Sequence, residues 1–104
     1  LLDIRLQWAK YLAWLLAAAR DPAIRNPQKA VEYALRACEL TGFEQADFVD
    51  TLAVAYAADG QFSLAIETAQ KALELAISKG NEDLVDEINK RRALYKDNKP
   101  YYDK

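Results

Sequence analysis

Apolar residues recur three or four positions apart through most of this chain, which is the spacing of one face of an α-helix. Gly, Pro and short polar segments interrupt this spacing at several points, where helices are expected to end. The first helix is predicted over about residues 3–19, and its apolar stripe consists of Ile4, Trp8, Leu12, Leu15 and Ala19. In total, the pattern predicts five helices.

The stretch 46–79 is expected to form two helices joined by a tight turn at Gly60. Glycine adopts positive φ without a steric penalty, so it suits such a turn. Small residues at helical spacing, Ala53 before the turn and Ala65 after it, allow two backbones to approach to the short end of the usual range of about 8–10 Å.

A second copy of this helix pair precedes it in the chain. Leu12 and Ala13 align with Leu52 and Ala53, 40 positions later. A helix over about 27–40 aligns with the later one at an offset of 35, through the pairs Ala30 and Ala65, Ala34 and Ala69, and Ala37 and Ala72. The first copy therefore has a longer internal loop, at 20–27, where Asn26 is an N-cap followed by a proline in the first helical position.

A fifth helix is predicted over about residues 82–97, after Asn81 as its N-cap. Its apolar face consists of Leu84, Val85, Ile88, Leu94 and Tyr95. The charged residues between them, Arg91 included, are expected to be solvated. Such a helix covers the apolar end of a stack of repeats. For the tail, 98–104, two outcomes are open: its tyrosines fold back on the fifth helix, or it frays.

The segment "ADFVDTLAVAYAADGQFSLAIETAQKALELAISK" resembles the tetratricopeptide repeat, a motif of about 34 residues. The resemblance includes Leu52, Ala53, Phe62, Ala65 and Ala72, while Ala69 and Ile77 depart from it. It implies one all-α domain over 1–104, a right-handed α-solenoid of the tetratricopeptide (TPR) type. The first repeat would cover about 3–41 with the inserted loop 20–27, the second about 46–79, and a capping helix about 82–97.

The resemblance also implies a function, the binding of a peptide or helix in a concave groove lined by the first helix of each repeat. The positions carried over onto this chain as protein-binding residues are Lys10, Trp14, Asp47, Asp50, Val54 and Ala58. Trp14 either anchors a ligand or packs beneath the loop around Pro22. Trp14 and Thr51 replace the asparagines of the carboxylate-binding members of the family, and the groove is acidic. A basic or apolar partner is therefore expected.

Charge is unevenly distributed along the 104 residues, although the net charge is only −2. Residues 39–87 contain eleven Asp or Glu and two Lys or Arg, while both flanking segments are basic. An acidic centre disfavours nucleic acid as a ligand, because neutralising phosphates requires a basic surface. The composition, with 52% hydrophobic residues, is typical of a soluble helical domain.

Few residues could perform chemistry. The chain has no His, one Cys and three isolated Gly, which excludes the common zinc, thiol-imidazole and phosphate-loop sites. Asp47 and Asp50 share a helix face, but acidic residues are favoured near a helix N-terminus for structural reasons. Cys38 is expected to pack in the core. We therefore predict no enzyme activity, no cofactor and no metal.

A second, looser resemblance, through segments such as "DPAIRNPQKAVEYALRACELTG", is to the C-terminal repeat segment of larger bacterial proteins. The chain begins without Met, so we expect a fragment of a larger parent protein, with a membrane anchor as one option for that parent. No direct membrane contact by this segment is expected, and the compartment is unknown. An alternative function is structural: the end of a longer repeat array, or self-association as a homodimer. Leu1, Leu2, Leu6 and Tyr11 suggest an apolar outer face that would serve this alternative.

Overall fold

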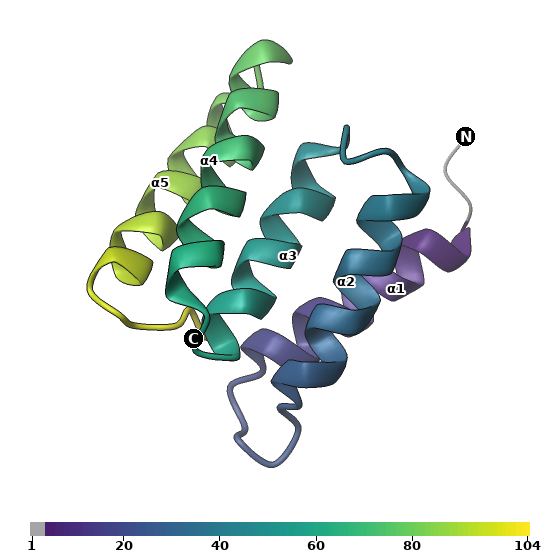
Figure 1. Cartoon of the computed structure of the whole chain (residues 1–104), viewed down its shortest axis with the longest axis vertical. Coiled ribbons are helices and arrows are strands. Elements are labelled where there is room, and N and C mark those ends of the chain that lie inside the picture. Colours follow the sequence, from purple (N-terminus) through teal and green to yellow (C-terminus); the bar gives the residue numbers. More distant parts are fainter. Residues whose placement is uncertain (1–3) are drawn as a thin grey trace.

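The computed structural model describes residues 4–104, in which the chain forms five α-helices and no strand (Figure 1). The all-α prediction is confirmed, and the observed bounds fall within one or two residues of the predicted ones. The helices are α1 (Ile4–Ala18), α2 (Pro27–Leu40), α3 (Ala46–Ala58), α4 (Phe62–Ser78) and α5 (Glu82–Lys96).

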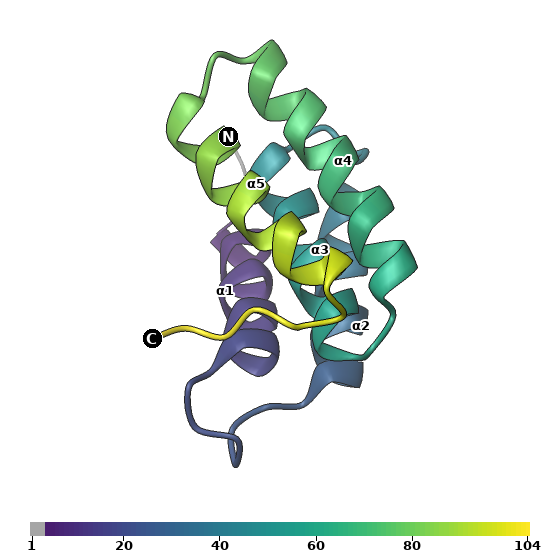
Figure 2. The same cartoon turned by 90° about the vertical axis from the view of Figure 1, so that its left-hand side faces the viewer.

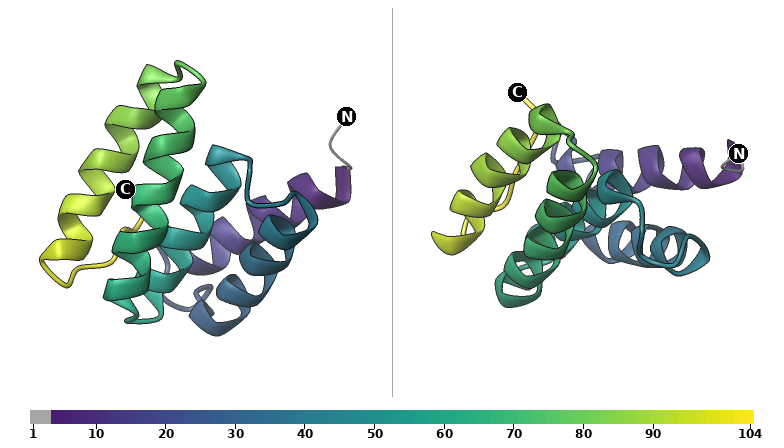
Figure 3. Two further views of the ribbon diagram at one scale, coloured as in Figure 1. Left: turned by 45° about the horizontal axis from the view of Figure 1, so that its top comes forward. Right: turned by 90° about the horizontal axis from the view of Figure 1, so that it is seen from above.

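Each helix packs against the next one along the chain, so the fold is a sequential stack. In addition, α3 contacts both α1 and α5, which places α3 at the centre of the molecule. The views in Figure 3 show α3, α4 and α5 running alongside one another, with α1 and α2 at the other end of the stack. One side of the stack is consequently built from α1, α3 and α5.

The core between the helices consists mainly of alanine. The small residues paired above between the two halves of the chain are each at most 2% exposed: Ala13, Ala53, Ala30, Ala65, Ala34, Ala69, Ala37 and Ala72. Short side chains at these positions let the helices pack closely, as the sequence indicated. Larger core residues, including Phe48, Ile88 and Tyr95, fill the spaces around the central helix.

Local signals define the helix ends. The Asn26 side-chain oxygen accepts a hydrogen bond from the Lys29 backbone N–H at 3.2 Å, and Asn81 caps α5 in the same way through the Leu84 N–H. Gly60 has a φ of 78°, in the left-handed region that glycine favours. These predicted caps and this turn are confirmed.

The apolar stripe predicted for the first helix faces solvent instead of the core. Ile4, Trp8, Leu12 and Leu15 are between 40% and 71% exposed, and of the stripe only Ala19 is buried. The helices α2 and α3 cover only the opposite side of α1, where Ala13 and Ala17 permit close approach. Leu1 and Leu2, also expected on an apolar outer face, lie outside the described residues.

Candidate interaction surfaces

The predicted groove corresponds to the side of the molecule formed by α1, α3 and α5, which faces the viewer in Figure 2. We call it the concave face. The structure places Lys10 and Trp14 on α1 here, and Asp47 and Asp50 on α3. A cavity of about 220 Å³ is lined by these four residues together with Tyr11 and Thr51. The structure thus brings four of the six predicted residues together.

Asp50 borders this cavity but is itself almost fully buried, because it forms an ion pair. Its carboxylate accepts hydrogen bonds from Arg91 Nη2 at 2.8 Å and from Arg91 Nε at 3.4 Å. The two side chains are 5% and 7% exposed. Burial raises the pKa of the Asp50 carboxyl, and the Arg91 guanidinium opposes that shift. Arg91 was predicted to be solvated. It is buried because Asp50 supplies its counter-charge from the neighbouring helix.

Two other predicted groove positions also differ from expectation in their exposure. Val54 is fully buried, and Ala58 is half-buried. Since α5 packs against α3 and α4, the surface of α3 near Val54 is closed to a ligand. Of the six predicted binding residues, Lys10, Trp14, Asp47 and Ala58 keep some exposed surface.

Lys10 and Asp47 connect α1 to α3 at the rim of the concave face. The Lys10 ammonium lies 2.9 Å from an Asp47 carboxylate oxygen, with side-chain exposures of 16% and 46%. It also lies 5.5 Å from the centroid of the Phe48 ring, within cation–π distance. The Lys10 ammonium and the Asp47 carboxylate therefore already neutralise each other within the chain, so Lys10 is not an unpaired cation awaiting an acidic ligand.

Trp14 is contacted by the C-terminal tail, whereas the sequence left open a ligand or the loop around Pro22. Its indole Nε1 donates hydrogen bonds to both carboxylate oxygens of Asp103, at 3.0 and 3.2 Å. The Tyr101 ring lies 5.7 Å from the Trp14 ring, centroid to centroid. The tail therefore folds back, which is one of the two outcomes left open by the sequence, and it lies against α1 as well as against α5.

A second surface is the exposed stripe on α1, which we call the open face: Ile4, Trp8, Tyr11, Leu12 and Leu15. It borders a cavity of about 360 Å³ that Tyr33 of α2 also lines. At the offset of 40 residues, Trp8, Leu12 and Leu15 align with Phe48, Leu52 and Ala55 of α3. Those three residues are all at most 3% exposed. The same helix positions are covered in the second half of the chain and uncovered in the first.

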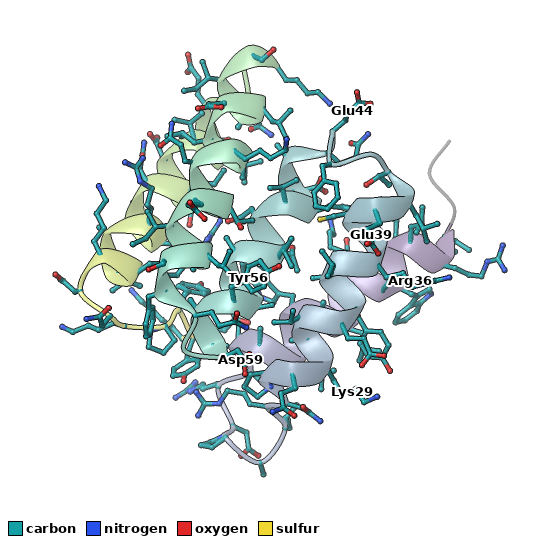
Figure 4. The ribbon with its side chains drawn as sticks, in the orientation of Figure 1. Lys29, Arg36, Glu39, Glu44, Tyr56 and Asp59 are labelled. Carbon is teal, nitrogen blue, oxygen red and sulfur yellow. The ribbon has the colours of Figure 1, made fainter. Side chains whose placement is uncertain are left out.

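The side of α2 that faces the viewer in Figure 4 is charged. Lys29, Arg36 and Glu39 are spaced along it and are exposed. The side chain of Lys29 also lies 3.4 Å from Glu32. This face is mainly charged, although Leu40 at its C-terminal end is also exposed, whereas the open face of α1 consists of apolar and aromatic side chains.

The described residues contain no group of three or more His, Cys, Asp or Glu side chains placed to hold a metal ion. Cys38 is fully buried, as expected for a core residue. Burial, together with the nearby carboxylates of Asp47 and Glu39, raises the pKa of its thiol to about 12. A thiol with that pKa stays protonated at neutral pH and is a poor nucleophile.

No family model, curated protein or solved structure matches this chain. Within residues 4–104, none of the helices combines the length and apolar character required to cross a membrane. The concave face and the open face differ in what covers them: the chain's own tail lies on the concave face, and none of residues 4–104 covers the open face.

Proposed function

We propose that this chain is a TPR-type helical-repeat domain whose function is to bind other proteins. Two helix pairs would form the repeats of a right-handed solenoid, with α5 as the capping helix. The support is the alignment between the halves, in which matching small residues such as Ala13 and Ala53 are buried at matching helix crossings. Sequential packing from α1 to α5 agrees with this arrangement.

The observation that carries the proposal is the open face of α1. Five large apolar side chains lie there in one stripe, exposed to solvent, whereas four of the five aligned positions fall in α3 and are buried there. Contiguous apolar surface of this kind is typical of interaction sites. Helix packing already covers the equivalent surface of α3, so another helix is the partner whose shape fits the open face.

We propose that a second copy of this chain covers it. The other exposed large apolar residues of the described chain, such as Leu64 and Ile77 on α4, lie outside this stripe. Because they are not part of a stripe like that of α1, we place the stripe against itself, as in a two-fold symmetric dimer. Helix α1 contains two basic residues, Arg5 and Lys10, and no acidic residue. Antiparallel packing would keep the two copies of Arg5 apart, which limits charge repulsion.

Light scattering over a wide range of protein concentration tests this dimer. We expect the mass to rise from 11.8 kDa towards twice that value, with little effect of added salt, because the contact is apolar. Leu12→Asp, in the centre of the open face, should keep the chain monomeric. Leu64→Asp is the matched control, since Leu64 is 41% exposed and Leu12 is 40% exposed. A mass of 11.8 kDa at every concentration refutes the proposed dimer.

A second candidate function is the binding of an extended peptide on the concave face, as the resemblance implies. The observation that favours it is the tail itself, which lies there in an extended form and makes both backbone and side-chain contacts with α1. Tyr11 lines the edge of both surfaces, but the tail contacts Trp14 and Ala18, which are not part of the open face.

A further inference from the structure

The chain's tail reaches the concave face through a sharp turn after α5. Asn98 has a φ of 58°, and the next backbone N–H, from Lys99, donates a hydrogen bond to the Leu94 carbonyl at 2.9 Å. The following residues have no helical structure and cross from α5 to α1, as the yellow C-terminal segment in Figure 2 shows. The backbone N–H of Asp103 then donates to the Ala18 carbonyl at 2.8 Å.

That last hydrogen bond uses a free acceptor at the end of a helix. Ala18 is the last residue of α1, and the final carbonyls of a helix have no partner within it. A segment of extended backbone can supply the missing donor whatever its side chains are. This contact therefore fixes the position of a bound segment, while side-chain contacts decide which segment binds.

The side-chain contacts select an aromatic ring and a carboxylate. The Tyr101 ring packs against the Trp14 ring. The Arg91 guanidinium lies 5.2 Å from the centroid of the Trp14 ring and 5.3 Å from the centroid of the Tyr101 ring. The indole N–H of Trp14 is directed at the Asp103 carboxylate, two residues further along the tail. Because Asp50 holds Arg91 in place, the site is preorganised by a buried ion pair.

We propose that the concave face is a binding site for an extended protein segment in which an aromatic residue is followed, two positions later, by a carboxylate. Residues 99–104 occupy it as a tethered competitor with the same chemistry. The proposal rests on the second candidate function and adds to it the chemistry of the partner. It also differs from the basic or apolar partner expected from the acidic composition, since Asp47 and Asp50 are already paired with Lys10 and Arg91.

A partner in trans competes against a tether that keeps the tail at an effective concentration in the millimolar range. Contacts that the tail does not make can favour the partner. The cavity of about 220 Å³ beside Trp14 extends over Lys10, Tyr11 and Thr51, and a longer segment could place a further side chain in it. A partner therefore displaces the tail only if it binds the site more tightly than the tail does or is present at a higher concentration than the tail's effective concentration.

The test uses the full chain and a fluorescent peptide with the sequence of residues 97–104, followed by fluorescence anisotropy. In wild type, the tethered tail should block the peptide. The double variant Tyr101→Ala/Asp103→Ala should bind it at least tenfold more tightly, because the competing groups are removed. Adding Trp14→Phe to this variant should weaken binding again by about tenfold, since the indole donor is lost. Circular dichroism confirms that each variant is folded, and Asp103→Asn alone is a milder second variant.

Two control peptides separate the possible failures. One replaces the tyrosine and aspartate equivalent to Tyr101 and Asp103 with alanine, and the other has the same composition in scrambled order. If all three peptides bind the double variant equally, the concave face binds extended segments but the proposed chemistry is wrong. If none binds, both the chemistry and the second candidate function are refuted. Measuring in the Leu12→Asp background keeps any effect of dimerisation out of the result.

Discussion

Removing Asp50 should destabilise the fold far more than removing any exposed carboxylate. Asp50→Ala leaves the Arg91 guanidinium 7% exposed and without its main counter-charge. Breaking a buried pair in this way costs about 3–5 kcal/mol. Glu87 remains 3.4 Å from Arg91 Nη1 and is 54% exposed, so it compensates in part and places the expected loss at the lower end, about 3 kcal/mol. That is a large share of the 5–15 kcal/mol or so that stabilises a typical domain.

The control is Asp47→Ala, which removes a carboxylate from the same helix. The Lys10–Asp47 pair has an almost equal distance, 2.9 Å against 2.8 Å, but Asp47 is 46% exposed. An exposed pair contributes about 0.2–1 kcal/mol. The two substitutions therefore compare the stability lost from a buried ion pair with that lost from an exposed ion pair of almost the same length.

Urea unfolding followed by circular dichroism measures both losses. With a slope of about 1–3 kcal/mol per molar urea, a loss of about 3 kcal/mol lowers the midpoint by about 1–3 M. The double variant Asp50→Ala/Arg91→Met removes the unpaired charge, so it should be more stable than Asp50→Ala alone. Equal losses for Asp50→Ala and Asp47→Ala, or a double variant less stable than Asp50→Ala, would refute this account of the pair.

Three further predictions concern the core. Ala53→Leu should cost about 1–3 kcal/mol in urea unfolding, because Ala53 is fully buried at a helix crossing, whereas Ala93→Leu on the exposed side of α5 should be nearly neutral. Tyr95→Phe should leave the melting temperature unchanged or raise it, since the buried Tyr95 hydroxyl has no hydrogen-bond partner among the described residues; a clear fall in melting temperature would contradict this. Cys38 should resist a chromogenic thiol reagent at pH 8 and react fully only in urea, because its thiol is buried with a pKa of about 12; rapid labelling of the folded chain would show that it is accessible.

Helix bounds and small-residue contacts could be predicted from the sequence because the information is local or periodic. The Asn26–Pro27 pair starts a helix wherever it occurs before a helical pattern, and Gly60 marks a turn for conformational reasons. Alanines repeated at offsets of 35 and 40 positions identify where helices cross, because only a small residue permits close approach at both sites.

One signal was present in the sequence and was missed. Leu84, Ile88, Arg91 and Tyr95 follow one another at intervals of four, three and four, which is the spacing of the buried face of α5. Arg91 therefore occupies a core position, and an arginine there requires a buried acidic partner. The sequence alone does not identify that partner as Asp50, which lies 41 residues earlier.

The amino-acid sequence by itself determined five helices, their caps and the repeated small residues that bring neighbouring helices together. Only the tertiary structure decided which side of α1 is buried, which acid neutralises Arg91, and where the tail lies. These outcomes depend on side chains far apart in sequence, 89 residues apart for Trp14 and Asp103. Helical spacing defines a face but not what covers it, because that depends on the packing of all the other helices.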